Sequence, residues 1–188
     1  MISKRVAIYG GSFNPPHMGH VLAVTYALAV HPVDAVLVIP CFQHPFAKDL
    51  VSFSHRFALC ERAFGWLPGV EVSRVEAELG GESRTLRTLE ALRERYPSWS
   101  FRLLVGADIL HDAPQWYAFD RVTELAPLLV LGRCGVVAPG APQPLLPEVS
   151  STELRTWLQG GNLARARELM PSRVMDYILQ HGLYGVAS

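Results

Sequence analysis

Residues 10–20 read Gly10-Gly11-Ser12-Phe13-Asn14-Pro15-Pro16-His17-Met18-Gly19-His20, and they lie between two apolar segments at 6–9 and 21–30. This order predicts a strand, a glycine turn and the start of a helix. Such a junction gathers unpaired backbone N–H groups and the positive end of a helix dipole, which together favour a phosphate. Because His17 and His20 are three residues apart, they share one face of a helix and can both donate to one anion.

Two simpler interpretations compete with a phosphate site. Gly-Gly followed by Pro-Pro is typical of any loop, and a lone histidine is usually a surface residue or a hydrogen-bonded core residue. The complete order of strand, glycines, Phe, Pro, His-x-Gly-His and helix is far more demanding than either. The stretch resembles the phosphate-binding signature of the nucleotidylyltransferase superfamily, Gly-x-Phe-x-Pro-x-His-x-Gly-His, and it matches every fixed position.

The composition is that of a soluble globular protein. The chain has 188 residues, 49% hydrophobic and 18% charged, which is enough for one well-buried domain over 1–188. Its 17 basic and 17 acidic side chains cancel, so no overall field attracts nucleic acid or an anionic membrane. The apolar run before Gly10 is too short for a signal peptide. We expect a cytoplasmic protein with no nucleic-acid or membrane partner, and the sequence leaves open whether it forms a homo-oligomer.

Neither the cysteines nor the proline-rich segment suggests a site. Cys41, Cys60 and Cys134 form no Cys-x-x-Cys pair and no zinc-binding spacing, so we expect free, buried thiols. Residues 139–147 are rich in proline, and we expect them to form an exposed connection.

Strand-like and helix-like segments alternate along the chain. Strands are predicted for the apolar or alternating runs at 6–9, 35–39, 70–73, 101–105 and 128–131. Helices are predicted at 21–30, 55–67, 85–96 and 119–125. We therefore expect an α/β fold, a Rossmann-like doubly wound parallel sheet with helices on both faces and a small helical C-terminal region. Ligands of such sheets bind beyond the carboxyl ends of the strands.

A second phosphate signal lies at residues 149–155. Ser150 and Glu153 have the spacing of a capping box, and helix capping alone explains that pair. Ser151 and Thr152 add hydroxyl and backbone donors at the helix start, and Arg155 lies on the same turn. The segment resembles the second superfamily signature, Ile-Ser-Ser-Thr-x-x-Arg, with Val149 in place of Ile.

Two further candidates follow the predicted strand at 101–105. Gly106-Ala107-Asp108 ends a predicted strand, where the Asp108 carboxylate can accept hydrogen bonds from ribose hydroxyls, although a helix cap explains it almost as well. Trp116 can be a core residue or a plate on which a flat heterocycle stacks.

The chain also resembles one branch of that superfamily over nearly its whole length, the bacterial nicotinate mononucleotide adenylyltransferases. The matching segments are 10–20, 83–89, 106–108, Trp116, 133–135 and 150–155. The resemblance implies catalytic roles for His17, His20 and Arg155. It implies ATP binding by Gly10, Gly11, Ser12, Phe13, His20, Gly106, Asp108, Arg133, Ser150, Ser151, Thr152 and Arg155. It implies mononucleotide binding by Lys48, Arg84, Thr85 and Trp116.

The chain departs from the branch pattern at several positions. Ser12 and Asn14 replace the usual Thr and Asp, which are mild changes, whereas Arg84 replaces a Tyr of the pyridine-binding segment. Lys48 also comes one position late in its loop. The pyridine substrate is therefore less firmly indicated than the chemistry.

The resemblance implies adenylyl transfer from ATP, accompanied by Mg²⁺, to a pyridine mononucleotide, with nicotinate mononucleotide as the expected acceptor. No metal site made of protein side chains is expected, because Mg²⁺ can be held by phosphates and water. The alternatives are nicotinamide mononucleotide or phosphopantetheine as acceptor, or a nucleotide-binding protein without catalysis. A Rossmann dehydrogenase is disfavoured because Gly10-Gly11-Ser12 lacks the Gly-x-Gly-x-x-Gly pattern.

Overall fold

The computed structural model describes residues 3–44, 49–107, 116–133 and 142–186. Its strands are β1 (Arg5–Gly11), β2 (Ala35–Pro40), β3 (Val70–Val72), β4 (Ser100–Gly106), β5 (Leu128–Arg133) and β6 (Pro144–Leu146). Its helices are α1 (Met18–Val30), α2 (Phe53–Phe64), α3 (Val75–Leu79), α4 (Thr85–Arg95), α6 (Phe119–Leu125), α7 (Ser151–Gln159), α8 (Leu163–Glu168) and α9 (Ser172–Gln180), followed by a 3₁₀ turn, η2 (Leu183–Gly185).

The strands form one parallel sheet in the order β3-β2-β1-β4-β5-β6. Val6 of β1 pairs with Ala35 on one side and with Phe101 on the other, so β1 and β4 are the central neighbours. This is the strand order of a doubly wound dinucleotide-binding sheet, and the order reverses between β1 and β4. The predicted doubly wound parallel sheet is confirmed.

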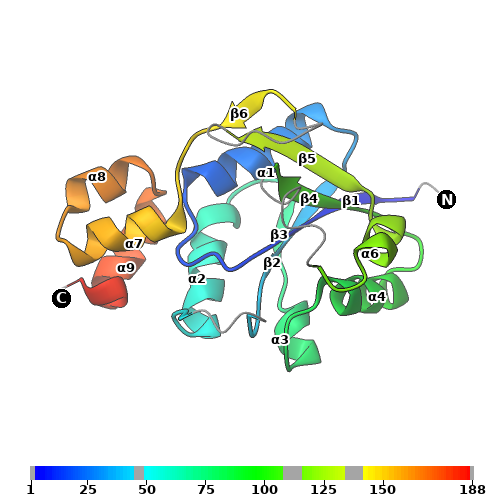
Figure 1. The fold of residues 1–188 in the computed structure, drawn as a ribbon, viewed down its shortest axis with the longest axis horizontal. Helices are drawn as coiled ribbons and strands as arrows, with labels where there is room; N and C mark the ends of the chain where they lie inside the picture. Colours follow the sequence, from blue (N-terminus) through cyan, green and yellow to red (C-terminus); the bar gives the residue numbers. More distant parts are fainter. Residues whose placement is uncertain (1–2, 45–48, 108–115, 134–141, 187–188) are drawn as a thin grey trace.

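Helices cover both faces of the sheet (Figure 1). One core cluster joins alternate strand residues such as Ala7, Val36 and Leu104 to α1 and α2, and the other joins Ile8 and Leu103, among others, to α4 and α6. Neighbouring strand residues point to opposite faces, so an uninterrupted apolar run supplies both cores at once.

The C-terminal helices α7, α8 and α9 extend the face formed by α1 and α2. They gather beside α2 at the end of the molecule opposite α4 and α6 (Figure 1). Leu154 of α7 and Ile178 of α9 are fully buried in the same core cluster as Val24 of α1 and Phe64 of α2. The expected helical C-terminal region is confirmed, and this packing brings the start of α7 to the carboxyl edge of the sheet.

The expectation of an exposed connection over 139–147 is wrong for its last residues. Residues 144–146 form β6, which pairs with β5, and Leu146 is buried. The chain just before β6 passes close to Gly132 of β5. A glycine is required there, because a Cβ at this position would overlap the carbonyl oxygens of Pro142 and Gln143. The short apolar pair Leu145-Leu146 supplied too little pattern to reveal an edge strand.

Cys41 and Cys60 are buried free thiols, as expected, whereas Cys134 lies outside the described residues. Burial raises the pKa of the Cys60 thiol well above its ordinary value. Across the described part of the chain, no helix combines the length and the apolar character that crossing a membrane requires.

Candidate active site

The turn after β1 is held by the Phe13 side chain. Phe13 has a left-handed backbone (φ 47°), is only 2% exposed, and packs edge-on against Tyr9 and Phe64. Its ring also covers Gly11, where a Cβ would lie 3.2 Å from the ring. A left-handed conformation costs a bulky residue free energy, and burial of the ring offsets that cost. This turn connects β1 to the start of α1.

The two histidines are in direct contact at the start of α1. His17 is the N-cap residue, and its backbone N–H donates to Nδ1 of His20 at 3.1 Å. Their rings stack with centroids 3.7 Å apart. Because Nδ1 of His20 accepts this hydrogen bond, the neutral ring carries its proton on Nε2, and Nε2 is the atom that can donate to a ligand.

Gly19 makes this stacking possible. A Cβ on Gly19 would lie 3.0 Å from Cγ1 of Val149 and 3.1 Å from the ring of His17. With contacts this short the neighbouring side chains would have to give by a few tenths of an ångström, so a glycine in His-x-Gly-His favours the histidine packing. The position just before α7 thereby stays in contact with the first turn of α1.

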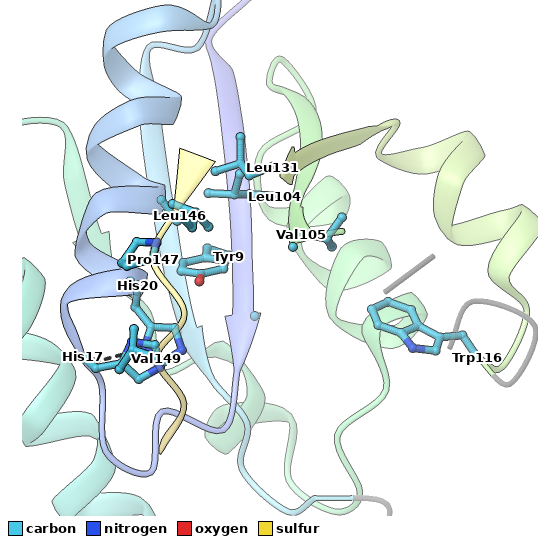
Figure 2. A pocket seen from close by; sticks show the side chains of 14 residues that line it. Tyr9, His17, His20, Leu104, Val105, Trp116, Leu131, Leu146, Pro147 and Val149 are labelled. Atoms are coloured by element: carbon cyan, nitrogen blue, oxygen red, sulfur yellow. Dashed lines mark hydrogen bonds between the residues drawn. The ribbon is translucent and has the colours of Figure 1, made fainter. Parts of the chain in front are cut away.

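A cavity of about 220 Å³ opens where the strand order reverses between β1 and β4. Figure 2 shows His17 and His20 at one end of it, Tyr9 near its middle and Trp116 at the other end. Trp116 packs edge-on against Phe119 and also contacts the core cluster formed with α4 and α6. It therefore combines a structural contact with a place in the cavity wall. The lining includes Gly10, Gly106, Leu104, Leu131, Leu146 and Pro147.

A second cavity, of about 840 Å³, meets the first at His17 and His20. It is lined by the turn after β1, by the chain before α2, by α7 with its N-cap residue and by η2: Ser12, Phe13, Asn14, Asp49, Leu50, Val51, Ser150, Ser151, Thr152, Arg155, Gln159, Tyr184 and Gly185. The histidine pair is therefore shared by two hollows, which is the arrangement needed where two substrates react with one another.

The start of α7 is fastened to the turn after β1. The Ser151 hydroxyl donates to the carbonyl oxygen of Pro15 at 2.8 Å, and the Arg155 guanidinium donates to the carbonyl oxygen of Asn14 at 2.8 Å. Arg155 also donates to the Thr152 hydroxyl at 3.2 Å. Ser150 and Glu153 form the predicted capping box. The two sequence signatures therefore form one surface, although more than a hundred residues separate them.

Several expected residues lie outside both cavity linings or outside the described residues. Among the described residues, Gly11, Arg84 and Thr85 belong to the lining of neither cavity. Arg84 is exposed, pairs with Glu82 at 2.8 Å and caps α4, of which Thr85 is the first residue. Lys48 and Asp108 lie outside the described residues, as does the side chain of Arg133, whose backbone ends β5.

Three residues that hold the site together were not among the predicted site residues. Arg56 of α2 is 2% exposed, and its guanidinium donates to the carbonyl oxygens of Ser12, Phe42 and Val51 at 3.0–3.3 Å. It thereby ties together the loops that follow β1 and β2. Asn14 and Tyr184 are the other two, and they join the turn after β1 to the C-terminal turn at 3.0 Å.

Comparison with known proteins agrees with this geometry. The sequence profile of the cytidylyltransferase-like family matches residues 8–157. The probable nicotinate-nucleotide adenylyltransferase of Myxococcus xanthus is 44% identical over 186 residues, covering 97% of this chain and 95% of the relative. The protein of that name from Anaeromyxobacter dehalogenans is 45% identical over 185 residues, covering 96% and 97%.

Solved structures share the fold. Plasmodium falciparum nicotinic acid mononucleotide adenylyltransferase, complexed with NaAD, superimposes with a TM-score of 0.84 at 20% identity, covering 98% of both chains. The crystal structure of a protein from Vibrio parahaemolyticus named "Putative Nicotinate-nucleotide Adenylyltransferase" superimposes with a TM-score of 0.72 at 24% identity, covering 96% of this chain and 95% of its own.

Proposed function

This chain belongs to the cytidylyltransferase-like family, and from that membership we propose that it transfers the adenylyl group of ATP to nicotinate mononucleotide in NAD biosynthesis. The products are nicotinate adenine dinucleotide and pyrophosphate. Relatives 44–45% identical over almost the whole chain carry the name of this activity. The structural observation that carries the proposal is the histidine pair, which both cavities share at the switch point of the sheet.

The chemistry requires positioning and charge stabilisation and no covalent intermediate with the protein. A phosphate oxygen of the mononucleotide attacks the α-phosphorus of ATP, a new P–O bond forms, and the bond to the β-phosphate breaks to release pyrophosphate. Negative charge moves onto the transferring and leaving phosphates, so preorganised donors aimed at them lower the barrier. We assign this role to His17, to Nε2–H of His20 and to Arg155. Their placement around the shared junction supports the assignment.

We propose that the other expected residues bind as the resemblance implies. ATP would contact Gly10, Gly11, Ser12, Phe13, Gly106, Asp108, Arg133, Ser150, Ser151 and Thr152, and the mononucleotide would contact Lys48, Arg84, Thr85 and Trp116. The cavity linings support the assignments for Gly10, Gly106, Trp116 and the start of α7. The Ser151 hydroxyl is already committed to Pro15, so we expect its contribution to come from its backbone N–H.

We propose that Mg²⁺ reaches the site bound to ATP. Mg²⁺ prefers oxygen ligands and keeps several waters, so phosphates and water can hold it without a protein cage. Within the described ranges, no three His, Cys, Asp or Glu side chains gather as a metal site. Activity that EDTA abolishes and MgCl₂ restores would support this proposal, whereas EDTA-resistant activity would contradict it.

The acceptor is tested by pyrophosphate release. Purified protein is mixed with ATP and, separately, with nicotinate mononucleotide, nicotinamide mononucleotide and phosphopantetheine, and kcat/KM is compared. Nicotinate mononucleotide should be preferred, because a carboxylate presents only acceptors, and a mispaired amide would leave a buried donor unsatisfied at a cost of about 1–3 kcal/mol. Equal efficiency, or a preference for another acceptor, would overturn the acid assignment. If none of the three acceptors supports pyrophosphate release, adenylyl transfer itself would be overturned.

The Arg84→Ala variant tests where the carboxylate specificity resides. The Arg84 side chain is exposed and paired with Glu82, so we expect Arg84 to contact the mononucleotide through its backbone N–H and the variant to keep most of the preference for the acid. Loss of the preference would instead assign the carboxylate contact to Arg84.

We also propose that residues 1–188 act as one domain in the cytoplasm. The shared core of α1, α2, α7 and α9 supports a single unit. A single cooperative unfolding transition, followed by circular dichroism and by calorimetry, is the expected result, and two separated transitions would contradict it.

A further inference from the structure

The Asn14 side chain joins three segments around the second cavity. Asn14 is 2% exposed. Its Nδ2 donates to the carbonyl oxygen of Asp49 at 3.4 Å, and its Oδ1 accepts from the backbone N–H of Val51 at 3.3 Å and from the Tyr184 hydroxyl at 3.0 Å. An amide both donates and accepts, so one buried side chain can satisfy all three partners.

The backbone of the same residue holds Arg155. The carbonyl oxygen of Asn14 accepts from the Arg155 guanidinium at 2.8 Å, and the same guanidinium donates to the Thr152 hydroxyl at 3.2 Å. A charge-assisted hydrogen bond can hold a guanidinium in place only if the accepting carbonyl group is itself held in place. The hydrogen bonds that hold the Asn14 side chain therefore also help to fix the position of the Arg155 guanidinium.

Tyr184 approaches this point from η2, the last described turn of the chain. It is 8% exposed and has a left-handed backbone (φ 60°). Burial raises the pKa of its hydroxyl far above the ordinary value, so the group stays protonated and donates to Asn14. Tyr184 is one of the lining residues of the second cavity, which the start of α7 also lines.

We propose that Tyr184 is a positioning residue for the reaction, acting through Asn14 on Arg155. The proposal rests on the adenylyl-transfer function. The Tyr184 hydroxyl holds the Asn14 side chain and so orients the Asn14 peptide. The carbonyl oxygen of that peptide in turn holds the Arg155 guanidinium toward the phosphates. An alternative is that Tyr184 only stabilises the C-terminal turn, and that alternative predicts a loss of stability without a specific effect on ATP.

The first experiment compares Tyr184→Phe with Tyr177→Phe. Each variant removes one hydroxyl from one hydrogen bond, and the Tyr177 hydroxyl bonds His55 at 3.1 Å between α2 and α9, outside both cavity linings. We expect Tyr184→Phe to lower kcat/KM for ATP about tenfold or more, because small displacements of a positioning group carry large rate costs. Tyr177→Phe should stay within about twofold of the parent chain. Wild-type kinetics for Tyr184→Phe would overturn the proposal.

The second experiment is a double-mutant cycle with Arg155→Ala. If Tyr184 acts through Arg155, then Tyr184→Phe should change kcat/KM by less than about twofold once Arg155 is absent. A full additional tenfold loss in the Arg155→Ala background would overturn the proposal. Should Tyr184→Phe fail to fold, Asn14→Ser replaces it in the same cycle, since it removes the amide and keeps the backbone carbonyl.

Calorimetric titration with MgATP separates this proposal from the function on which it rests. Tyr184→Phe should weaken ATP binding about tenfold while Tyr177→Phe leaves it unchanged, whichever acceptor the enzyme uses. If no mononucleotide supports turnover and this difference persists, the proposed function fails and the positioning role stands. If turnover is normal and the two variants bind ATP alike, the positioning role fails alone.

Discussion

Gly10→Ala should raise the stability of the protein and impair ATP binding at the same time. Gly10 lies in β1, pairs with Ile39 and lines the first cavity, and a Cβ built on it meets nothing within 4 Å. Its backbone is outside the left-handed region, so alanine fits without strain. Replacing a strand glycine by alanine should therefore increase the free energy of unfolding by about 0.5–1 kcal/mol.

The same methyl group occupies space that we assign to the nucleotide. Intrusion of one methyl group into a packed contact costs about 1–3 kcal/mol, which corresponds to a rise in the KM for ATP of about five- to 150-fold. Thermal unfolding measures the first effect, and pyrophosphate release at varied ATP measures the second. Gly10→Ala with an unchanged KM for ATP would refute the placement of the nucleotide against β1.

Gly19→Ala is the matched control for Gly10→Ala. Its Cβ would lie 3.0 Å from Val149 and 3.1 Å from the His17 ring, so it should lower stability and activity together. The two glycines belong to the same signature, yet one is needed for packing and the other for ligand access. A stabilised Gly19→Ala variant would contradict the distinction.

Three further predictions concern single side chains. His17→Ala and His20→Ala should each lower kcat about a hundredfold or more with the fold intact, and near-normal turnover in either variant would remove that histidine from the mechanism. Trp116→Ala should raise the KM for the mononucleotide much more than the KM for ATP if the indole stacks on the pyridine, since stacking contributes about 1–3 kcal/mol; equal rises would indicate a core role. A hydrogen bond from Arg5 lowers the pKa of Asp34 to about 2, so its contribution to stability is present above the ordinary carboxyl pKa of about 3.9 and is lost as the pH falls toward 2. Asp34→Asn should therefore flatten the dependence of Tm on pH in this range, and an unchanged pH profile would exclude the pair as a contributor.

Local patterns predicted most of the fold because its signals are local. The run at 35–39 is apolar throughout, and it became a strand buried on both faces. The pair Ser150 and Glu153 predicted a capping box, and both halves of it form. The signature at 10–20 predicted a strand, a turn and a helix in the right order, although β1 continues through both glycines to Gly11.

Contacts between distant segments could not be predicted in this way. Arg56 looks like any charged residue of an amphipathic helix, and only the assembled loops reveal three carbonyl acceptors around it. Asn14 was visible only as a replacement for aspartate, and no pattern linked it to Tyr184. The strand β6 escaped detection because edge pairing with β5 depends on Gly132 and on two apolar residues, which is too short a run for periodicity.

The Asn14–Tyr184 hydrogen bond joins residues 170 positions apart, so we expect the second cavity to be completed late in folding. Closing so long a loop carries an entropic cost that must be met before the contact stabilises anything, so we expect the sheet and its helices to assemble first. A folding intermediate with a complete sheet would then hold the histidine pair and still lack the wall made by η2. Nucleotide binding during refolding should therefore appear in the last kinetic phase, which makes ATP a reporter of the finished fold.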